Sequence, residues 1–164
     1  MFKMRLSLLF LVFFGFAMPS AKADYRILGI LGGFNFPKMF VGKLDVNLGE
    51  YAGIDIQESV GVYWSIQQAD VVYYFSRGEW SPYIAAGIQN WNFYGISAST
   101  NYNGVIFGSG NSAVALSAPL GLQYVADNGF ALDLTIAVDV FTNAPADLSG
   151  KVIPEAGLMM GYFF

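Results

Sequence analysis

The sequence predicts an all-β protein, an eight-stranded antiparallel up-and-down transmembrane β-barrel. Three observations predict this fold. The chain has 164 residues, of which 55% are hydrophobic and 12% charged, and this is too apolar for an ordinary soluble domain. After residue 23 it contains no apolar run long enough for a transmembrane helix. Its hydrophobic residues instead recur at every second position, with bulky side chains on one face and small or polar ones on the other.

The N-terminus is typical of a secretory signal peptide. Two basic residues precede an apolar stretch over residues 8–18, and Ala21-Lys22-Ala23 resembles a cleavage site. A membrane-spanning helix needs about 20 apolar residues, so this stretch is too short to be one. We therefore expect a cleaved signal peptide over residues 1–23 and a single barrel domain over residues 24–164.

Charge and composition exclude several classes of function. Cleavage leaves five basic residues against twelve acidic ones, a net charge of −7. An acidic chain with scattered basic residues offers no patch for a polyanion, so we expect no nucleic acid as a partner. The chain has no Cys and no His, which rules out Ser-His-Asp and Cys-His catalytic pairs and removes the main zinc ligands. We expect no cofactor and no metal.

The clearest strands lie in the C-terminal half. Residues 130–140 alternate bulky apolar side chains with small or acidic ones, and residues 114–124 repeat this pattern. Pro119 cannot donate to a sheet ladder, so we expect a bulge or local break there. Asp127-Asn128-Gly129 predicts a hairpin turn between these two strands. The pattern shifts phase near Glu58-Ser59. The other strands are expected at residues 25–36, 39–48, 53–64, 69–75, 82–94 and 155–164.

The size of the two faces indicates which one points outward. The interior of an eight-stranded barrel is only just wide enough for side chains, so the small and polar face suits the lumen. The bulky face then points to lipid, where a closed barrel leaves no backbone group unpaired. We expect two girdles of aromatic residues at the strand ends. One would contain Tyr73, Phe75, Trp80, Tyr83, Tyr124, Phe130, Tyr162 and Phe164, and the other Phe34, Phe36, Trp91, Phe93, Tyr94 and Phe141.

Three short motifs resemble those of a known family. The chain ends in Phe164 with Tyr162 two residues before it, although Met159 stands where a Gly is common. The run Ser81-Pro82-Tyr83-Ile84-Ala85-Ala86-Gly87-Ile88 resembles a recurring P-Y-x-G-x-G strand, with Ala85 in place of a Gly. Residues 120–138 resemble a sixth and a seventh strand. On these motifs the chain resembles the small outer-membrane β-barrels of the OmpA/OmpX-like porin superfamily.

The resemblance implies a location and two kinds of partner. A member of this superfamily lies in the outer membrane of a Gram-negative bacterium after its signal peptide is cleaved, in contact with outer-membrane lipid and lipopolysaccharide. Its C-terminal strand is recognised by the barrel-assembly machinery, which assigns an assembly signal to Tyr162 and Phe164. The deacylase and palmitoyltransferase types of outer-membrane enzyme use a His with a Ser, so no catalytic residue can be carried over to this chain.

The acidic residues of the small face are the remaining candidates for chemistry. Asp133 and Asp139 share that face but lie about 20 Å apart along one strand, too far to flank one bond. An unpaired buried charge is costly. We therefore expect a polar network in the lumen that joins these aspartates to partners such as Arg26 and Thr135. Further candidates for this network are Glu58, Asp70 and Glu155.

The sequence favours a non-enzymatic protein with a structural or surface-interaction role. The polar stretches at residues 97–111 and 142–154 are its longest loops, and we expect them to lie outside the cell and to contact an unknown surface ligand. Two alternatives stay open. One is a narrow pore or small-molecule site through the lumen. The other is a soluble secreted β-barrel carrier whose bulky face points inward around an apolar ligand.

Overall fold

The barrel strands follow one another along the chain as antiparallel neighbours. The computed structural model describes residues 26–94, 100–102, 105–107, 112–143 and 151–164. Two short strands, β6 (Thr100–Tyr102) and β7 (Val105–Phe107), pair with each other between β5 and β8. The barrel strands are β1 (Leu28–Phe36), β2 (Met39–Asn47), β3 (Ala52–Val60), β4 (Trp64–Tyr74), β5 (Trp80–Phe93), β8 (Ser112–Val125), β9 (Phe130–Asn143) and β10 (Val152–Phe163).

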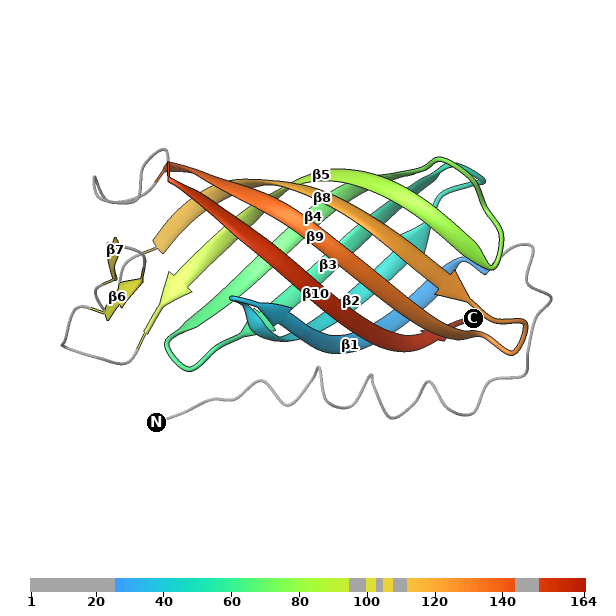
Figure 1. Ribbon diagram of the computed structural model, residues 1–164, viewed down its shortest axis with the longest axis horizontal. Helices are drawn as coiled ribbons and strands as arrows, with labels where there is room; N and C mark the ends of the chain where they lie inside the picture. The colour runs from blue at the N-terminus through green and yellow to red at the C-terminus, as the bar shows by residue number, and fades with distance from the viewer. Residues whose placement is uncertain (1–25, 95–99, 103–104, 108–111, 144–150) are drawn as a thin grey trace.

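The sheet closes because the last strand returns to the first. β10 pairs with β1 from Gly29↔Phe163 to Phe36↔Ala156. The order β1-β10-β9-β8-β5-β4-β3-β2 forms a closed barrel, so the barrel has no free edge (Figure 1). The predicted eight-stranded antiparallel up-and-down barrel is therefore confirmed. Among the residues that the structure describes, no helix has the length and apolar character needed to span a membrane.

The two ends of the barrel differ. We call one the turn end: it holds the connections 48–51, 75–79 and 126–129, together with the start of β1 and the C-terminus, at the right of Figure 1. The expected hairpin at residues 127–129 is one of these turns. Gly129 has a φ of 96°, which favours glycine, and its N–H donates to Ala126 O at 2.8 Å.

The opposite end, which we call the loop end, carries two short connections and the two longest ones. Here residues 37–38 join β1 to β2, residues 61–63 join β3 to β4, and longer segments join β5 to β8 and β9 to β10. The expected loop at 97–111 contains β6 and β7, and that at 142–154 is strand at both of its ends. The rest of these loops and the expected signal peptide at 1–23 lie outside the described residues, apart from Lys151.

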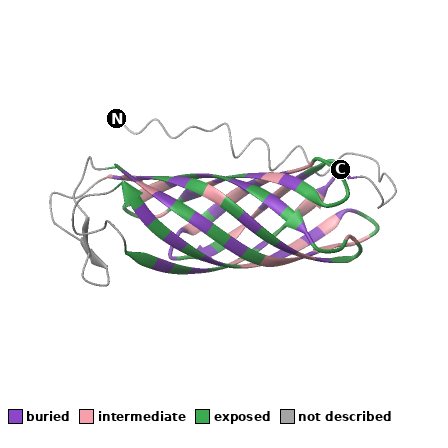
Figure 2. Ribbon diagram, turned by 90° about the horizontal axis from the view of Figure 1, so that it is seen from above, coloured by how far each residue is buried: buried purple, intermediate pink, exposed green. Residues whose placement is uncertain are grey.

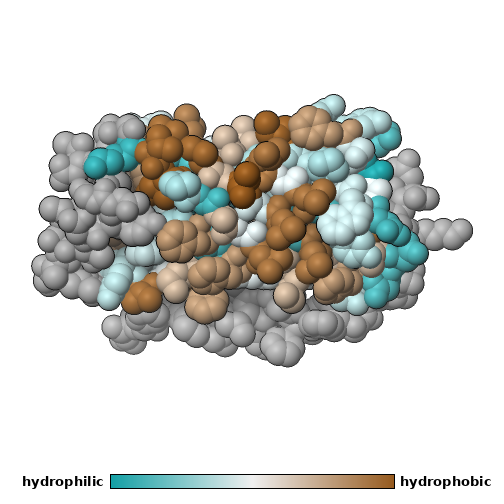
Figure 3. Space-filling view, viewed as in Figure 1, coloured by the Kyte–Doolittle hydropathy of each residue, from teal (hydrophilic) through white to brown (hydrophobic). Residues whose placement is uncertain are grey.

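Bulky apolar side chains cover the outside of the barrel. On β9, Leu134 and Ile136 are 49% and 59% exposed, whereas Asp133, on the opposite face of the same strand, is fully buried. The predicted faces of β8 and β10 alternate in the same way, and Figure 2 shows this alternation along the barrel strands that face the viewer. In Figure 3 hydrophobic side chains cover much of the middle of the wall. This arrangement is the reverse of what the soluble-carrier alternative requires.

Aromatic residues divide between the outer wall and the lumen. Tyr73, Phe75 and Trp80 are about half exposed at the turn end, and Phe34 and Phe36 at the loop end, as expected for girdles. Four expected girdle residues are instead buried in the lumen, and for these the prediction is wrong. These residues lie at the height expected for a girdle, but their strands turn them to the inner face. The four are Tyr83, Trp91, Phe93 and Phe141.

β3 and β4 depart from their expected bounds. The third strand ends at Val60 rather than residue 64, and β4 begins at Trp64 rather than residue 69. The first residues of β4 are not recognisable as a strand in the sequence. Ser65 and Gln67, on the outer wall, are polar and interrupt the hydrophobic alternation. The expected phase shift near Glu58 is absent, since the register between β3 and β4 is continuous from Ala52↔Tyr73 to Val60↔Ser65.

Pro119 produces a local break without a bulge. The ladder between β5 and β8 stops at Ile84↔Leu120 and resumes in the same register at Gly87↔Ser117, because Pro119 has no N–H to donate. On its other side β8 pairs continuously through this point, with Pro119 opposite Ala137. The register shift between β8 and β9 lies at Val114/Ala115, nearer the loop end.

Candidate functional site: the polar lumen

Lys43, in the middle of β2, is the centre of one buried ion-pair cluster. Its Nζ lies 2.6 Å from Asp133 Oδ2 and 2.7 Å from Asp55 Oδ2. Asp45 Oδ2 is more distant, at 3.9 Å. The Tyr83 hydroxyl donates to the other oxygen of Asp133 at 2.9 Å, and its ring centre lies 5.4 Å from the ammonium. This cluster joins β2, β3, β5 and β9 across the lumen.

Lys38 is the centre of a second cluster nearer the loop end. It belongs to the connection between β1 and β2, but its side chain points into the lumen and is completely buried. Its Nζ lies 2.6 Å from Glu155 Oε1 and 3.7 Å from Asp139 Oδ2, and it donates to Gln68 Oε1 at 2.6 Å. Gln89 Nε2 donates to Asp139 Oδ1 at 2.7 Å. The turn is thereby fastened to β4, β9 and β10.

Side-chain amides and hydroxyls extend the two clusters. Asp70 accepts from Gln68 Nε2 at 2.6 Å and from Gln57 Nε2 at 3.2 Å. Asp45 accepts from Gln123 Nε2 at 2.8 Å and from the Tyr74 hydroxyl at 3.2 Å. Because buried charges are costly without partners, these donors are part of what allows the carboxylates to remain in the lumen.

An apolar layer fills the lumen at the loop end. Trp91 and Phe141 lie with their ring centres 5.4 Å apart, and Trp91 and Phe93 stack at 6.1 Å. Ile66 and Ile153 complete the layer, and all five side chains are at most 5% exposed. Below it the Trp91 indole N–H donates to Gln89 Oε1 at 2.8 Å, which joins the layer to the polar network.

The turn end of the lumen is filled as well. Leu31, Met159 and Phe163 pack together on one side and are at most 3% exposed. Tyr74 and Tyr83 pack on the other side with ring centres 5.6 Å apart. The Arg77 guanidinium lies 3.4 Å from the centre of the Tyr74 ring, on the way out of the barrel. The described side chains therefore seal the polar network between two apolar layers.

The structure separates the two aspartates that the sequence singled out. Asp133 lies in the Lys43 cluster, where Thr135 Oγ1 donates to it at 3.0 Å. Asp139 lies in the Lys38 cluster. Arg26 is buried at the turn end, where its guanidinium donates to the carbonyl oxygens of Phe163, at 3.3 Å, and of Asp127. The ammonium groups of Lys43 and Lys38 thus contact Asp133 and Asp139, respectively.

Tyr162 and Phe164 lie on the outer wall where β10 meets β1. The Phe164 N–H donates to Leu28 O at 2.8 Å, and its carbonyl oxygen accepts from Ile27 N at 3.1 Å. The Tyr162 ring lies 6.3 Å from Phe130 and 6.5 Å from Phe164. These residues therefore help to close the barrel, and their role as an assembly signal stays a prediction.

Sequence reasoning missed both lysines at the centres of the network. Lys43 could have been found, because Lys43 and Asp45 occupy alternate positions of one strand and face Asp55 and Gln57 on the next. Lys38 could not have been found in this way. It lies in a connection, where the alternation of a strand does not indicate which side chains point inward. Of the further candidates, Asp70 and Glu155 are buried in the network, whereas Glu58 lies on the outer wall.

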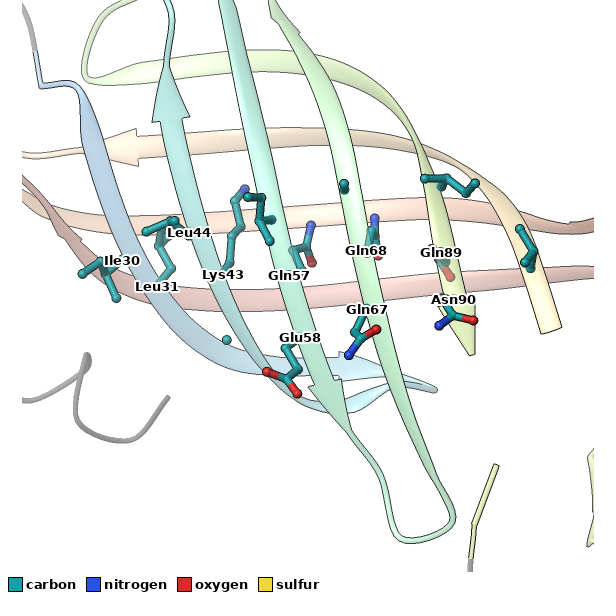
Figure 4. Close-up of a pocket in the computed structure, with 15 residues that line it drawn as sticks. Ile30, Leu31, Lys43, Leu44, Gln57, Glu58, Gln67, Gln68, Gln89 and Asn90 are labelled. Carbon is teal, nitrogen blue, oxygen red and sulfur yellow. The ribbon is translucent and has the colours of Figure 1, made fainter. Parts of the chain in front are cut away.

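Glu58 belongs to a polar interruption of the outer wall. In the strand register Glu58 lies opposite Gln67, and Gln67 lies opposite Asn90. Figure 4 shows the three side chains on the neighbouring strands β3, β4 and β5. They line a hollow of about 550 Å³ together with Ile56 and Ile88. These two isoleucines are more than half exposed, while the inward side chains of the same strands are buried. The lining also includes five buried side chains of the lumen face, so residues of both faces of the strands contribute to it: Leu31, Lys43, Gln57, Gln68 and Gln89.

Tyr94 fastens the neighbouring connection at the loop end. It follows the last residue of β5, and its hydroxyl donates to Trp64 O at 2.9 Å. Burial, and to a smaller extent the nearby carboxylate of Glu58, raise the pKa of the Tyr94 hydroxyl above its ordinary value. Tyr94 therefore stays protonated and keeps this hydrogen bond at neutral pH.

Comparison with solved structures identifies the fold. The crystal structure of the N-terminal β-barrel domain of Pseudomonas aeruginosa OprF matches 84% of this chain and 95% of its own, with a TM-score of 0.60 and 19% identity. The chain has the fold of a small outer-membrane β-barrel. A weaker match is the crystal structure of the outer membrane enzyme PagL, with a TM-score of 0.46, 16% identity, and coverage of 82% of this chain and 97% of that one. No family model and no curated protein matches the chain.

Proposed function

We propose that the protein is an integral outer-membrane β-barrel with a sealed lumen and a structural or surface-interaction role. The observation that carries this proposal is the sealed polar network inside an apolar wall. Bulky side chains such as Leu134 and Ile88 are about half exposed on the outside, which is stable in lipid and not in water. The mature chain would begin after the signal peptide at residues 1–23, with the turn end facing the periplasm.

A sealed lumen supports the structural role over the pore alternative. Conduction of hydrated ions needs a continuous aqueous path, and eight strands leave room only for side chains. Here that room is taken by Trp91, Phe141 and Ile66 at one end and by Phe163, Leu31 and Met159 at the other. Between these layers many polar groups bond to one another, as Lys43 does to Asp133 and Gln89 to Asp139.

The same geometry supports a non-enzymatic role. The chain has no His or Cys, so general acid–base work would fall to carboxyl groups. Asp133 and Asp139 lie in separate clusters and are fully buried, out of reach of a lipid substrate at the outer wall. Purified protein incubated with outer-membrane lipid is expected to leave the lipid mass spectrum unchanged, and a new product that depends on the protein would contradict this.

The loop end is the surface that we assign to interactions. Its two longest connections, at residues 97–111 and 142–154, would face the cell exterior and meet lipopolysaccharide or a surface ligand. Tyr162 and Phe164 would present the C-terminal strand to the barrel-assembly machinery. The apolar wall between the two ends would contact the lipid.

Fractionation combined with electrophoretic mobility tests the membrane location. Cells expressing the full chain are separated into soluble, inner-membrane and outer-membrane fractions, and each is run in SDS with and without boiling. We expect the protein in the outer-membrane fraction, lacking residues 1–23, with a different mobility when it is not boiled because the closed barrel resists SDS. A soluble protein without a mobility change would overturn the proposal.

A further inference from the structure

Two neighbouring rows of outward side chains border the hollow on the outer wall. Each row consists of positions that lie opposite one another in the strand register, and we call the row nearer the loop end the upper row. The upper row contains Gly42, Glu58, Gln67 and Asn90, and the lower row Ile30, Leu44, Ile56, Ala69 and Ile88. All of them are exposed or half-buried, so the hollow has an outer border across β1 to β5.

The two rows run obliquely along the wall because the strands of a closed barrel are tilted. Gly42 lies five positions from Asn47, the turn-end bound of β2, whereas Asn90 lies ten positions from Trp80, the turn-end bound of β5. The polar members of the upper row are therefore nearer the loop end than Gly42. Figure 4 shows Ile30 and Leu44 on the β1–β2 side and the polar side chains on the β3–β5 side. The border thus changes from apolar to polar as it rises toward the loop end.

The polar members of the upper row have hydrogen-bonding groups to spare. Within the described residues, the side chains of Gln67 and Asn90 form no hydrogen bond and Glu58 forms no ion pair. The two amides each offer N–H donors and a carbonyl acceptor, whereas the Glu58 carboxylate only accepts. Polar groups that leave water are costly without partners. An occupant of this border therefore has to donate hydrogen bonds at its polar end and be apolar at the other.

We propose that the two rows bind one acyl chain of lipopolysaccharide, an inference that rests on the outer-membrane location proposed above. The hydrocarbon chain lies along Ile88, Ala69 and Ile56 and descends toward Gly42. The amide and hydroxyl groups at the root of such a chain bond to Gln67 and Asn90 and donate to Glu58. Phosphatidylcholine has neither an N–H nor an O–H, so it leaves the Glu58 carboxylate without a donor.

Charge argues against a second copy of this chain as the occupant. A two-fold interface places the same surface of both subunits together, so an interface centred on the upper row would bring two Glu58 carboxylates close to each other. Among the described residues Glu58 has no ion-pair partner to offset this repulsion. A lipid that donates hydrogen bonds fits the same surface without it.

Lipid retention by the folded protein tests this site. The full chain is purified in detergent in its SDS-resistant form, and lipopolysaccharide with a minimal sugar is added to one sample and phosphatidylcholine of matched chain length to another. Native mass spectrometry then counts the lipids that stay on each barrel as the detergent concentration is raised. We expect about one lipopolysaccharide per barrel under conditions that remove phosphatidylcholine, by mass action.

Two variants and one control locate the bound lipid. Ala69→Phe fills the lower row from the outer side, where Ala69 is exposed, and is expected to weaken retention of lipopolysaccharide by about tenfold. Ala118→Phe makes the same change at an exposed position of β8 that does not line the hollow, and is expected to behave like the parent protein. Gln67→Leu keeps the size of the side chain and removes its hydrogen bonds, so the preference for lipopolysaccharide over phosphatidylcholine is expected to fall.

Three results would overturn the lipid site. They are equal retention in the two phenylalanine variants, equal retention of both lipids by the parent protein, and a dimer that Ala69→Phe dissociates, since a second copy would then occupy the rows. The mobility and fractionation tests keep this inference separate from the proposed function. An SDS-resistant barrel in the outer membrane that retains no lipopolysaccharide refutes the lipid site alone, whereas a soluble protein refutes both.

Discussion

At the scale of single residues, Lys43 is the side chain on which most of the lumen charge depends. Its Nζ is within 2.7 Å of both Asp133 and Asp55, and all three groups are at most 3% exposed. Lys43→Met would keep most of the volume and leave both carboxylates without their cation. Removing one partner of a buried ion pair costs about 3–5 kcal/mol of stability. We expect the free energy of unfolding, measured in urea on the micelle-bound protein, to fall by this amount.

Lys151→Met is the matched control for this change. Lys151 is exposed at the loop end, and a substitution at such a site changes stability by about 0.5 kcal/mol or less. If the two methionine variants unfolded at the same urea concentration, Lys43 would not carry the charge of the lumen.

Leu134 tests which face of a strand meets the lipid. It lies on the outer wall of β9, in register with Leu122 on one side and Leu158 on the other. Arg at the middle of a membrane-spanning strand costs about 2–4 kcal/mol when it faces lipid, so we expect Leu134→Arg to lower stability by this amount in vesicles. Ala137→Ser, on the lumen face of the same strand, is expected to be mild. A harmless Leu134→Arg would show that the wall does not face lipid.

At the scale of elements, β5 and β8 meet through a glycine and a tyrosine. Gly121 lies opposite Tyr83, and a Cβ on it would overlap the Tyr83 ring. Gly121→Ala should therefore displace the Tyr83 hydroxyl from Asp133, and overpacking of this kind costs about 1–3 kcal/mol. Gly32→Ala is the control, because the nearest atom to its added Cβ would be Val41 O at 3.7 Å. Equal unfolding midpoints for the two variants would contradict this packing.

Where β10 meets β1, the backbone of Phe164 closes the barrel, while its side chain is the expected assembly signal. Phe164 closes the barrel through its backbone, with its N–H on Leu28 O, so a change of side chain leaves these bonds in place. We expect Phe164→Ser to reduce the amount of protein that reaches the outer membrane in cells, while refolding of the purified protein into micelles changes little. If the variant assembled normally in cells, the Phe164 side chain would not be part of the assembly signal.

The elements also show what the sequence could predict. β8, β9 and β10 were placed correctly because their alternation is unbroken by polar residues on the outer face. The start of β4 is harder to predict because Ser65 and Gln67 make its outer face polar, while the apolar Trp64 and Ile66 lie on the inner face. The inward position of Phe141 follows from the alternation of β9 continued one residue beyond Val140, so for this residue the face, and not the height on the strand, is the better guide.

At the scale of the whole molecule, the closed sheet brings together side chains that are far apart in sequence. Lys43 and Asp133 are 90 positions apart and form one ion pair. The sequence could predict that acidic residues on the small face need partners, because that follows from burial alone. It could not choose the partners, since that choice depends on the register of eight strands and on Lys38 turning inward from a connection.

We propose that this barrel crosses the membrane with its lumen closed. Ion conductance of the full chain, purified in the SDS-resistant form and reconstituted into planar lipid bilayers, tests it most directly. A boiled sample and a larger porin serve as controls. We expect no conductance above that of the boiled sample, because Trp91 and Phe141 at one end and Phe163 and Met159 at the other fill the lumen. Reproducible channels that scale with the amount of folded protein would contradict the claim and establish a pore.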